Sequence, residues 1–128
     1  MRRPCVPNMT HESILILFKG DWVPREKNTG LSADAKSWLA HGVWKIGTEQ
    51  AQRIGHQAPF PVELPDRCIQ LFSLEYDYVL DPFLGSGTTI IAAHQNGRIG
   101  LGIEKLEKYG AVILERLSDL GLEPRQIT

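Results

Sequence analysis

Short apolar runs alternate with helical patterns in the carboxyl-terminal half of the chain. The runs at 77–80 and 98–103 are bounded by turn residues, which is typical of strands. A helix is expected over 87–96, and residues 105–120 carry apolar side chains at three- and four-residue intervals, which predicts a second helix. Strands that alternate with helices predict an α/β fold with a parallel sheet.

The amino-terminal half has weaker patterns. Residues 14–18 are continuously apolar, which predicts a strand buried on both faces and therefore a sheet with layers above and below it. Residues 43–46 predict another short strand, in which Trp44 is a core residue or part of a cofactor wall. Ser32 is a suitable cap for a short helix that continues through Leu39.

A proline-rich segment at 56–65 separates these halves. Its three prolines fix the backbone and should keep it out of a helix until after Pro65. From Asp66 onward an amphipathic helix is expected, ending near residues 76–77.

The strand at 77–80 runs into Asp81 and then into a glycine-rich turn, which is followed by Thr88 and Thr89. In an open α/β sheet, cofactors bind at the carboxyl end of a strand, facing the start of the next helix. Glycines permit the sharp turn and a close approach of the ligand. The unpaired N–H groups of the helix's first turn suit a carboxylate or a phosphate.

Three cofactor classes compete for this loop. A phosphate-binding P-loop would end in Gly-Lys-Ser/Thr, but Thr88 follows the glycine directly. A dinucleotide fingerprint would need a glycine at the position of Ile90. S-adenosylmethionine remains, and another α/β nucleotide-binding class stays as an alternative. Glu104 follows Asp81 by 23 residues, at the end of the next strand. An acid at this place can accept hydrogen bonds from the hydroxyls of a ribose. The alternative is that Glu104 is an ordinary surface acid.

The nine residues Asp-Pro-Phe-Leu-Gly-Ser-Gly-Thr-Thr at 81–89 closely resemble the cofactor loop of DNA methyltransferases that make N6-methyladenine or N4-methylcytosine. Residues 56–64 match every fixed position of that family's His-x-Ala-x-Phe-Pro-x-x-Leu segment. Residues 11–19 are similar to the segment that precedes its target-recognition region.

This resemblance implies part of a Rossmann-like, three-layer α/β/α fold that binds S-adenosylmethionine between the proline-bearing segment and the glycine loop. His56 taken alone would more often be structural. The resemblance implies that the cofactor-binding residues are His56, Ala58, Phe60, Leu64, Asp81, Phe83, Gly85, Ser86, Gly87, Thr88 and Glu104.

The family's chemistry also needs a polar–Pro–Pro–aromatic motif that grips the target amine and stacks on a flipped base. No two prolines are adjacent in these 128 residues. The segment Asp81-Pro82-Phe83 looks similar to the motif, but it has a single proline and belongs to the cofactor loop. The resemblance, over about 11–117, therefore covers only the carboxyl-terminal half of a member. Without the neighbouring strand, 77–80 has an open edge, so pairing is expected.

The missing strand could come from a second polypeptide that carries the motif or from a second copy of this chain, or the chain could be a truncated remnant. We expect residues 1–128 to form one half-domain without catalytic residues of its own. As an enzyme it would be an S-adenosylmethionine-dependent DNA N-methyltransferase that is inactive as an isolated chain. The rival interpretation is a DNA-binding or regulatory module without the chemistry.

Composition adds little for a DNA role, because the net charge is only −1. Binding of double-stranded DNA would therefore need a local basic patch. The candidates for this patch, which could equally be ordinary solvated surface, are Arg2, Arg3, Lys19, Arg25 and Lys27. Residues 20–42 are a possible short target-recognition insert or a surface loop. Cys5 and Cys68 have neither a metal-ligand spacing nor a disulfide framework, which favours reduced thiols in the cytoplasm and no metal. No apolar run is long enough for a membrane span.

Overall fold

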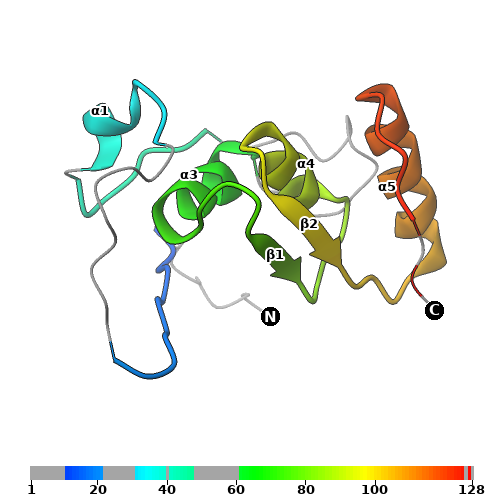
Figure 1. Ribbon diagram of the computed structural model, residues 1–128, viewed down its shortest axis with the longest axis horizontal. Helices are drawn as coiled ribbons and strands as arrows, with labels where there is room; N and C mark the ends of the chain where they lie inside the picture. The colour runs from blue at the N-terminus through cyan, green and yellow to red at the C-terminus, as the bar shows by residue number, and fades with distance from the viewer. Residues whose placement is uncertain (1–10, 22–30, 40, 48–60, 126, 128) are drawn as a thin grey trace, which may run out of the picture.

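The computed structural model describes residues 11–21, 31–39, 41–47, 61–125 and 127 (Figure 1). Most of its regular structure lies between residues 63 and 119, as the alternating pattern predicts. The elements in chain order are α1 (Ala35–Leu39), α3 (Glu63–Phe72), β1 (Tyr78–Asp81), α4 (Thr88–Gln95), β2 (Ile99–Gly102) and α5 (Glu107–Asp119).

The two strands form a parallel pair joined through α4. Tyr78 lies opposite Ile99, and Asp81 lies opposite Gly102, so both strands end at the same edge. Gly100 allows α4 to lie close to the sheet, since a Cβ added there would meet the Cα of Ile90 at 3.2 Å. This strand–helix–strand unit confirms the predicted α/β class.

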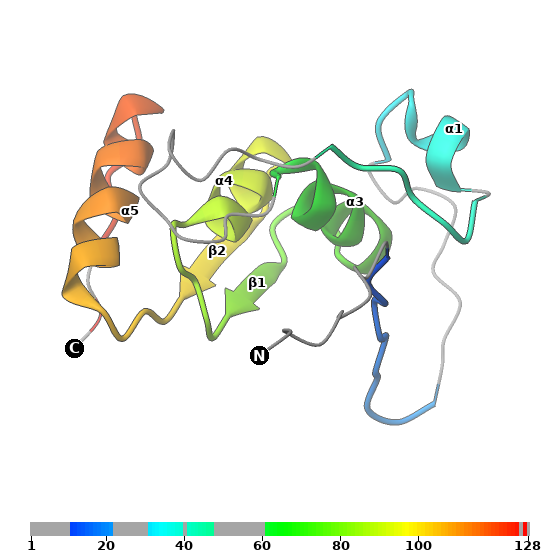
Figure 2. The same cartoon turned by 180° about the vertical axis from the view of Figure 1, so that it is seen from behind.

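Helix α4 lies between α3 and α5 in both views of the ribbon (Figures 1 and 2). Its Ala92 and Ala93 are fully buried and pack with Ile69 of α3. On its other side, α4 contributes to a cluster shared with the glycine loop and α5, which consists of Leu84, Ile91, Ile113 and Leu117. The second cluster contains Leu84 and therefore anchors the glycine loop to α4 and α5.

The opposite face of the two-stranded sheet is exposed. Tyr78 is 71% exposed and Leu80 is 61% exposed, whereas Val79, which points the other way, packs against the cluster of Ile69, Ala92 and Ala93. Within the described residues β1 pairs with β2 alone. The part of the chain that the structure describes therefore supplies one helical layer and a small open sheet.

Two local predictions are corrected. Residues 14–18 form no strand, and their side chains are at least 50% exposed rather than buried on both faces. Residues 43–46 also form no strand. An extended segment needs a neighbouring strand to become part of a sheet, and neither segment pairs with one among the described residues.

The helix boundaries also differ from the prediction at three places, one of which is the end of α3, at Phe72 rather than near residues 76–77. Helix α3 begins at Glu63, so Pro65 lies inside its first turn, where a missing N–H costs no helical hydrogen bond. The predicted short helix is present as α1, but Asp34, not Ser32, directly precedes its first residue. The remaining helices lie within a residue or two of their predicted bounds.

Candidate cofactor site

The loop between β1 and α4 turns through two glycines in the left-handed region. Gly85 has a φ of 58° and Gly87 a φ of 84°. Other residues adopt this conformation only under strain, so both positions favour glycine. Gly87 directly precedes α4, so the turn delivers the chain to the helix's amino terminus at the carboxyl end of the sheet.

Asp81 fastens the start of this loop to the helix that follows it. Its Oδ1 accepts the backbone N–H of Phe83 at 2.9 Å, and its Oδ2 accepts the hydroxyl of Thr89 at 2.6 Å. The Asp81 side chain therefore links the start of the loop to the first turn of α4. Phe83, at the tip, is 88% exposed, which leaves its ring available to a ligand or to another polypeptide.

Glu104 fastens the other side of the loop. Its Oε2 accepts the N–H of Gly85 at 2.8 Å, and its Oε1 accepts the N–H of Leu106 at 2.7 Å. The backbone of Ile103 adds two bonds, accepting from Leu84 at 3.0 Å and donating to the Asp81 carbonyl at 2.9 Å. Asp81, the last residue of β1, and Glu104, two residues after β2, thus both bond to the glycine loop.

Ser86 and Thr88 face inward. Ser86 is 4% exposed and Thr88 is 3% exposed, and their hydroxyl oxygens lie 3.4 Å apart. Arg116 of α5 donates to the Ser86 carbonyl at 2.6 Å and lies 3.3 Å from the Thr88 hydroxyl. The side chains of Ser86 and Thr88 therefore make contacts within the loop and with α5.

Arg116 was not singled out by sequence reasoning as a site residue. The available signal was its position on the apolar stripe of α5, where it stands next to Leu117. A charged residue on a buried helical face usually has a specific partner, because burying an unpaired charge is costly. Thr89, the partner of Asp81, was likewise not among the predicted site residues.

The structure brings together most of the predicted site residues on the glycine-loop side, namely Asp81, Phe83, Gly85, Ser86, Gly87, Thr88 and Glu104. The predicted opposite wall is only partly described. His56, Ala58 and Phe60 lie outside the described residues, and Leu64 is half-buried in the first turn of α3. Val62, two residues before Leu64, packs against the cluster that contains Leu84, so the end of the proline-rich segment reaches the loop's underside.

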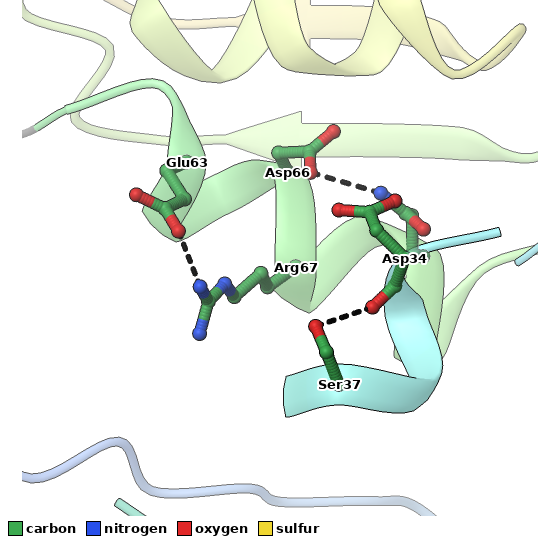
Figure 3. A network of polar contacts seen from close by, with 6 residues as sticks. Asp34, Ser37, Glu63, Asp66 and Arg67 are labelled. Carbon is green, nitrogen blue, oxygen red and sulfur yellow. Dashed lines mark hydrogen bonds and ion pairs between the residues drawn. The ribbon is translucent and has the colours of Figure 1, made fainter. Parts of the chain in front are cut away.

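Part of the possible recognition insert rests against α3. The Arg67 guanidinium lies over the rings of Trp38 and Trp44, at 5.2 and 5.5 Å from their centroids. Ser32 donates its N–H to Gln70 of α3 at 3.0 Å. Figure 3 shows Arg67 paired with Glu63 along α3, and Asp34 bonded to Ser37 on the neighbouring segment. A role for 20–42 in base recognition stays a prediction.

Of the five basic residues considered for DNA, only Lys19 is described, so the basic patch stays a prediction. Among the described residues, no three His, Cys, Asp or Glu side chains gather in a way that could hold a metal ion. No described helix has the length and apolar character needed to cross a membrane.

The family model for DNA methylases of the N6- and N4-directed type matches residues 5–115 of the chain. The type II methyltransferase M.BglI of Bacillus subtilis is 38% identical over 98 residues, which cover 77% of this chain and 28% of that protein. M.MjaI of Methanocaldococcus jannaschii is 36% identical over 126 residues, covering 91% of this chain and 40% of that one.

A solved structure from Thermus thermophilus, the DNA modification methylase TTHA0409 in complex with S-adenosyl-L-methionine, is similar with a TM-score of 0.62. The two chains are 32% identical, and the match covers 78% of this chain and 40% of the Thermus chain. The chain thus spans two fifths or less of the length of each of these three relatives.

Proposed function

This chain belongs to the DNA methylase family of N6-adenine and N4-cytosine methyltransferases, and from that premise we propose that it is the S-adenosylmethionine-binding portion of a site-specific DNA methyltransferase. The substrate would be double-stranded DNA, methylated on the exocyclic amine of adenine or cytosine. The whole reaction is proposed for the assembled enzyme and not for these 128 residues alone.

One observation carries the proposal. Asp81 and Glu104, from the ends of adjacent parallel strands, flank a loop whose backbone turns at Gly85 and Gly87. That edge of an open α/β sheet is where nucleotide-like ligands bind, and an acid on the second strand suits ribose hydroxyls. A carboxylate group of the ligand would suit the N–H groups at the start of α4.

The residues present fit this cofactor. The Glu104 carboxylate accepts backbone N–H groups, and a carboxylate oxygen can accept more than one donor, including a ribose hydroxyl. Phe83 offers an exposed ring beside the loop. We propose that Phe83, Gly85, Ser86, Gly87 and Thr88 meet the methionine end, with the predicted wall of His56, Ala58, Phe60 and Leu64 closing the pocket.

The base-binding motif would come from outside these residues. We propose a second polypeptide that carries the polar–Pro–Pro–aromatic motif and lies along β1, where Tyr78 and Leu80 expose an apolar face. Bare apolar sheet surface is unfavourable in water, and an unpaired edge invites another strand. A homodimer is the competing assembly, and sedimentation of the chain with and without the candidate polypeptide separates the two.

Titration calorimetry with S-adenosylmethionine tests the cofactor role directly. We expect the full chain, or its complex with the motif-bearing polypeptide, to bind the cofactor, and S-adenosylhomocysteine to compete for the same site. Glu104→Ala should weaken binding, whereas Glu115→Ala, at an exposed position on α5, should not. Absence of binding by both the chain and the complex would remove the proposal.

The alternative is a non-catalytic DNA-binding or regulatory remnant. It is favoured by the internal use of both carboxylates, since all four oxygens of Asp81 and Glu104 already accept hydrogen bonds from the chain. A remnant would retain the fold and these bonds without cofactor affinity. The same calorimetric experiment therefore separates the two functions.

A further inference from the structure

Helix α5 reaches back to the glycine loop through a long, charged side chain. Arg116 Nη1 donates to the Ser86 carbonyl at 2.6 Å and lies 3.3 Å from Thr88 Oγ1. These partners are 30 and 28 residues away in sequence, so the contact joins two separate parts of the fold. Ser86 and Thr88 are both nearly inaccessible to water.

The Ser86 carbonyl needs such a partner. It lies between the left-handed turns at Gly85 and Gly87, ahead of the first residue of α4, and Ser86 is buried. A buried carbonyl without a donor loses its hydrogen bond to water without replacement. The guanidinium provides that donor and carries a charge, which makes the bond stronger than one between neutral groups.

Ile113, one turn before Arg116 on α5, also packs against the loop. A Cβ added at Gly87 would lie 3.3 Å from Ile113 Cγ1, so the Ile113 side chain already touches the turn. Ile113 and Arg116 stand on the same face of α5, three residues apart. Together they hold residues 86–88, while Asp81 and Glu104 hold the loop at Phe83 and Gly85.

We propose that Arg116 is a positioning residue of the cofactor loop. By holding the Ser86 carbonyl and the Thr88 hydroxyl, it keeps the backbone of 85–88 in the conformation in which the Gly85 and Gly87 N–H groups bond to Glu104 and Leu84, and so it fixes the shape of the loop that the ligand meets. This statement about the ligand rests on the proposed function, whereas ordering of the loop does not. Both contacts come from one nitrogen, Nη1, so we expect the ammonium group of a lysine to replace them in part, because its shorter stem places the donor differently.

Hydrogen exchange on the full chain without any ligand tests the ordering of the loop. In Arg116→Met, amides of 84–88 should exchange about tenfold faster or more, while those of β1 stay unchanged, because one charge-assisted bond is lost. Arg116→Lys should lie between Arg116→Met and the wild type. Arg125→Met removes the same charge from an exposed position after α5 and serves as the matched control.

Calorimetry with S-adenosylmethionine then tests the consequence. Its affinity should fall about tenfold in Arg116→Met, be partly restored in Arg116→Lys, and be unchanged in Arg125→Met. Unchanged loop exchange in Arg116→Met overturns the inference, and so does faster exchange with undiminished affinity. If Arg116→Met does not fold, Arg116→Lys and Thr88→Val, which removes one of the two acceptors, give the same readouts.

The two proposals fail in distinguishable ways. If the wild-type chain and its complex do not bind S-adenosylmethionine, the proposed function is wrong, and the exchange data alone decide whether Arg116 orders the loop. If the wild type binds and the Arg116 variants bind equally well, the positioning role is wrong and the cofactor role stands.

Discussion

The Glu104 carboxylate accepts the backbone N–H of Gly85 at 2.8 Å and thereby ties the segment after β2 to the glycine loop after β1. Its other oxygen accepts the N–H of Leu106 just before α5. One side chain thus fixes the loop and the start of the next helix relative to each other. A ligand held by Glu104 would meet a loop that is already in place.

Replacing Glu104 should therefore affect stability as well as binding. Glu104→Ala removes the acceptor of two backbone N–H groups, and we expect the free energy of unfolding to fall by about 1–3 kcal/mol. Glu104→Gln keeps one acceptor oxygen and should lose less. Urea denaturation followed by circular dichroism measures both, with Glu115→Gln as a matched control on exposed surface. Equal stability of all three variants would contradict the bridging role.

Gly102 is required for space beside the loop. A Cβ at this position would lie 2.9 Å from Leu84 Cγ and closer still to its Cδ2, and Leu84 is 6% exposed in the core beneath the loop. We expect Gly102→Ala to destabilise the chain by about 1–3 kcal/mol, because the core cannot take the extra methyl group without moving. Thermal unfolding measures the loss, and adding Leu84→Val should recover part of it.

Gly110 provides the matched comparison for Gly102. It lies inside α5, and a Cβ there would meet nothing within 4 Å. Alanine is the better helix former, so Gly110→Ala should raise the free energy of unfolding by about 0.5–1 kcal/mol. If both glycine substitutions shift stability in the same direction, crowding against Leu84 is not the cause of the Gly102 effect.

The carboxyl-terminal half could be predicted from sequence because its patterns are local. The residues of β1, α4, β2 and α5 follow one another along the chain, and each strand pairs with the next through the intervening helix. Residues 14–18 show the opposite case. Apolar character indicates that a segment can be a strand, but strand formation depends on a neighbouring strand, and residues 14–18 pair with none that the structure describes.

The geometry of the glycine loop was predictable to a similar degree, whereas its role in binding a cofactor stays a prediction. The glycine positions and the acid on the next strand could be read from spacing, since the turn and the sheet edge depend on few residues. The Arg116 contact could not, because it depends on how α5 packs against the loop from 30 residues away. Asp81 and Glu104 were predicted to lie near a ligand, but their structural bonds to Phe83, Thr89 and Gly85 were not foreseen.

The apolar face of β1 should make the isolated chain associate. Tyr78 and Leu80 point away from the helices and are mostly exposed. We expect Tyr78→Thr combined with Leu80→Thr to reduce self-association in analytical ultracentrifugation and to reduce binding of a hydrophobic dye. Threonine favours strands, so the secondary structure in circular dichroism should persist.

Val79 is the internal control for that experiment, because it lies between Tyr78 and Leu80 but points to the helices. It packs against the cluster of Ile69, Ala92 and Ala93. Val79→Thr should therefore lower the unfolding temperature and leave self-association unchanged, since it places a hydroxyl in a packed apolar environment. Association that responds to Val79→Thr but not to the outward-facing pair would exclude the exposed face as its cause.

Burial of the Cys68 thiol should make the free energy of unfolding depend on pH on the alkaline side. Burial raises the pKa of the Cys68 thiol, because the thiolate is poorly solvated within α3. The folded state then holds this proton more tightly than the unfolded state, whose thiol has a pKa of about 8.5. The stabilisation is complete below that value and is lost as the pH rises through the folded pKa.

In a Cys5→Ser background, which leaves Cys68 as the single cysteine, urea denaturation from about pH 7 to 10 should show a steeper alkaline loss of stability than the same chain with Cys68→Ala. The difference between the two curves cancels the tyrosines and lysines that also titrate there, and parallel curves would show that burial of this thiol has no energetic consequence.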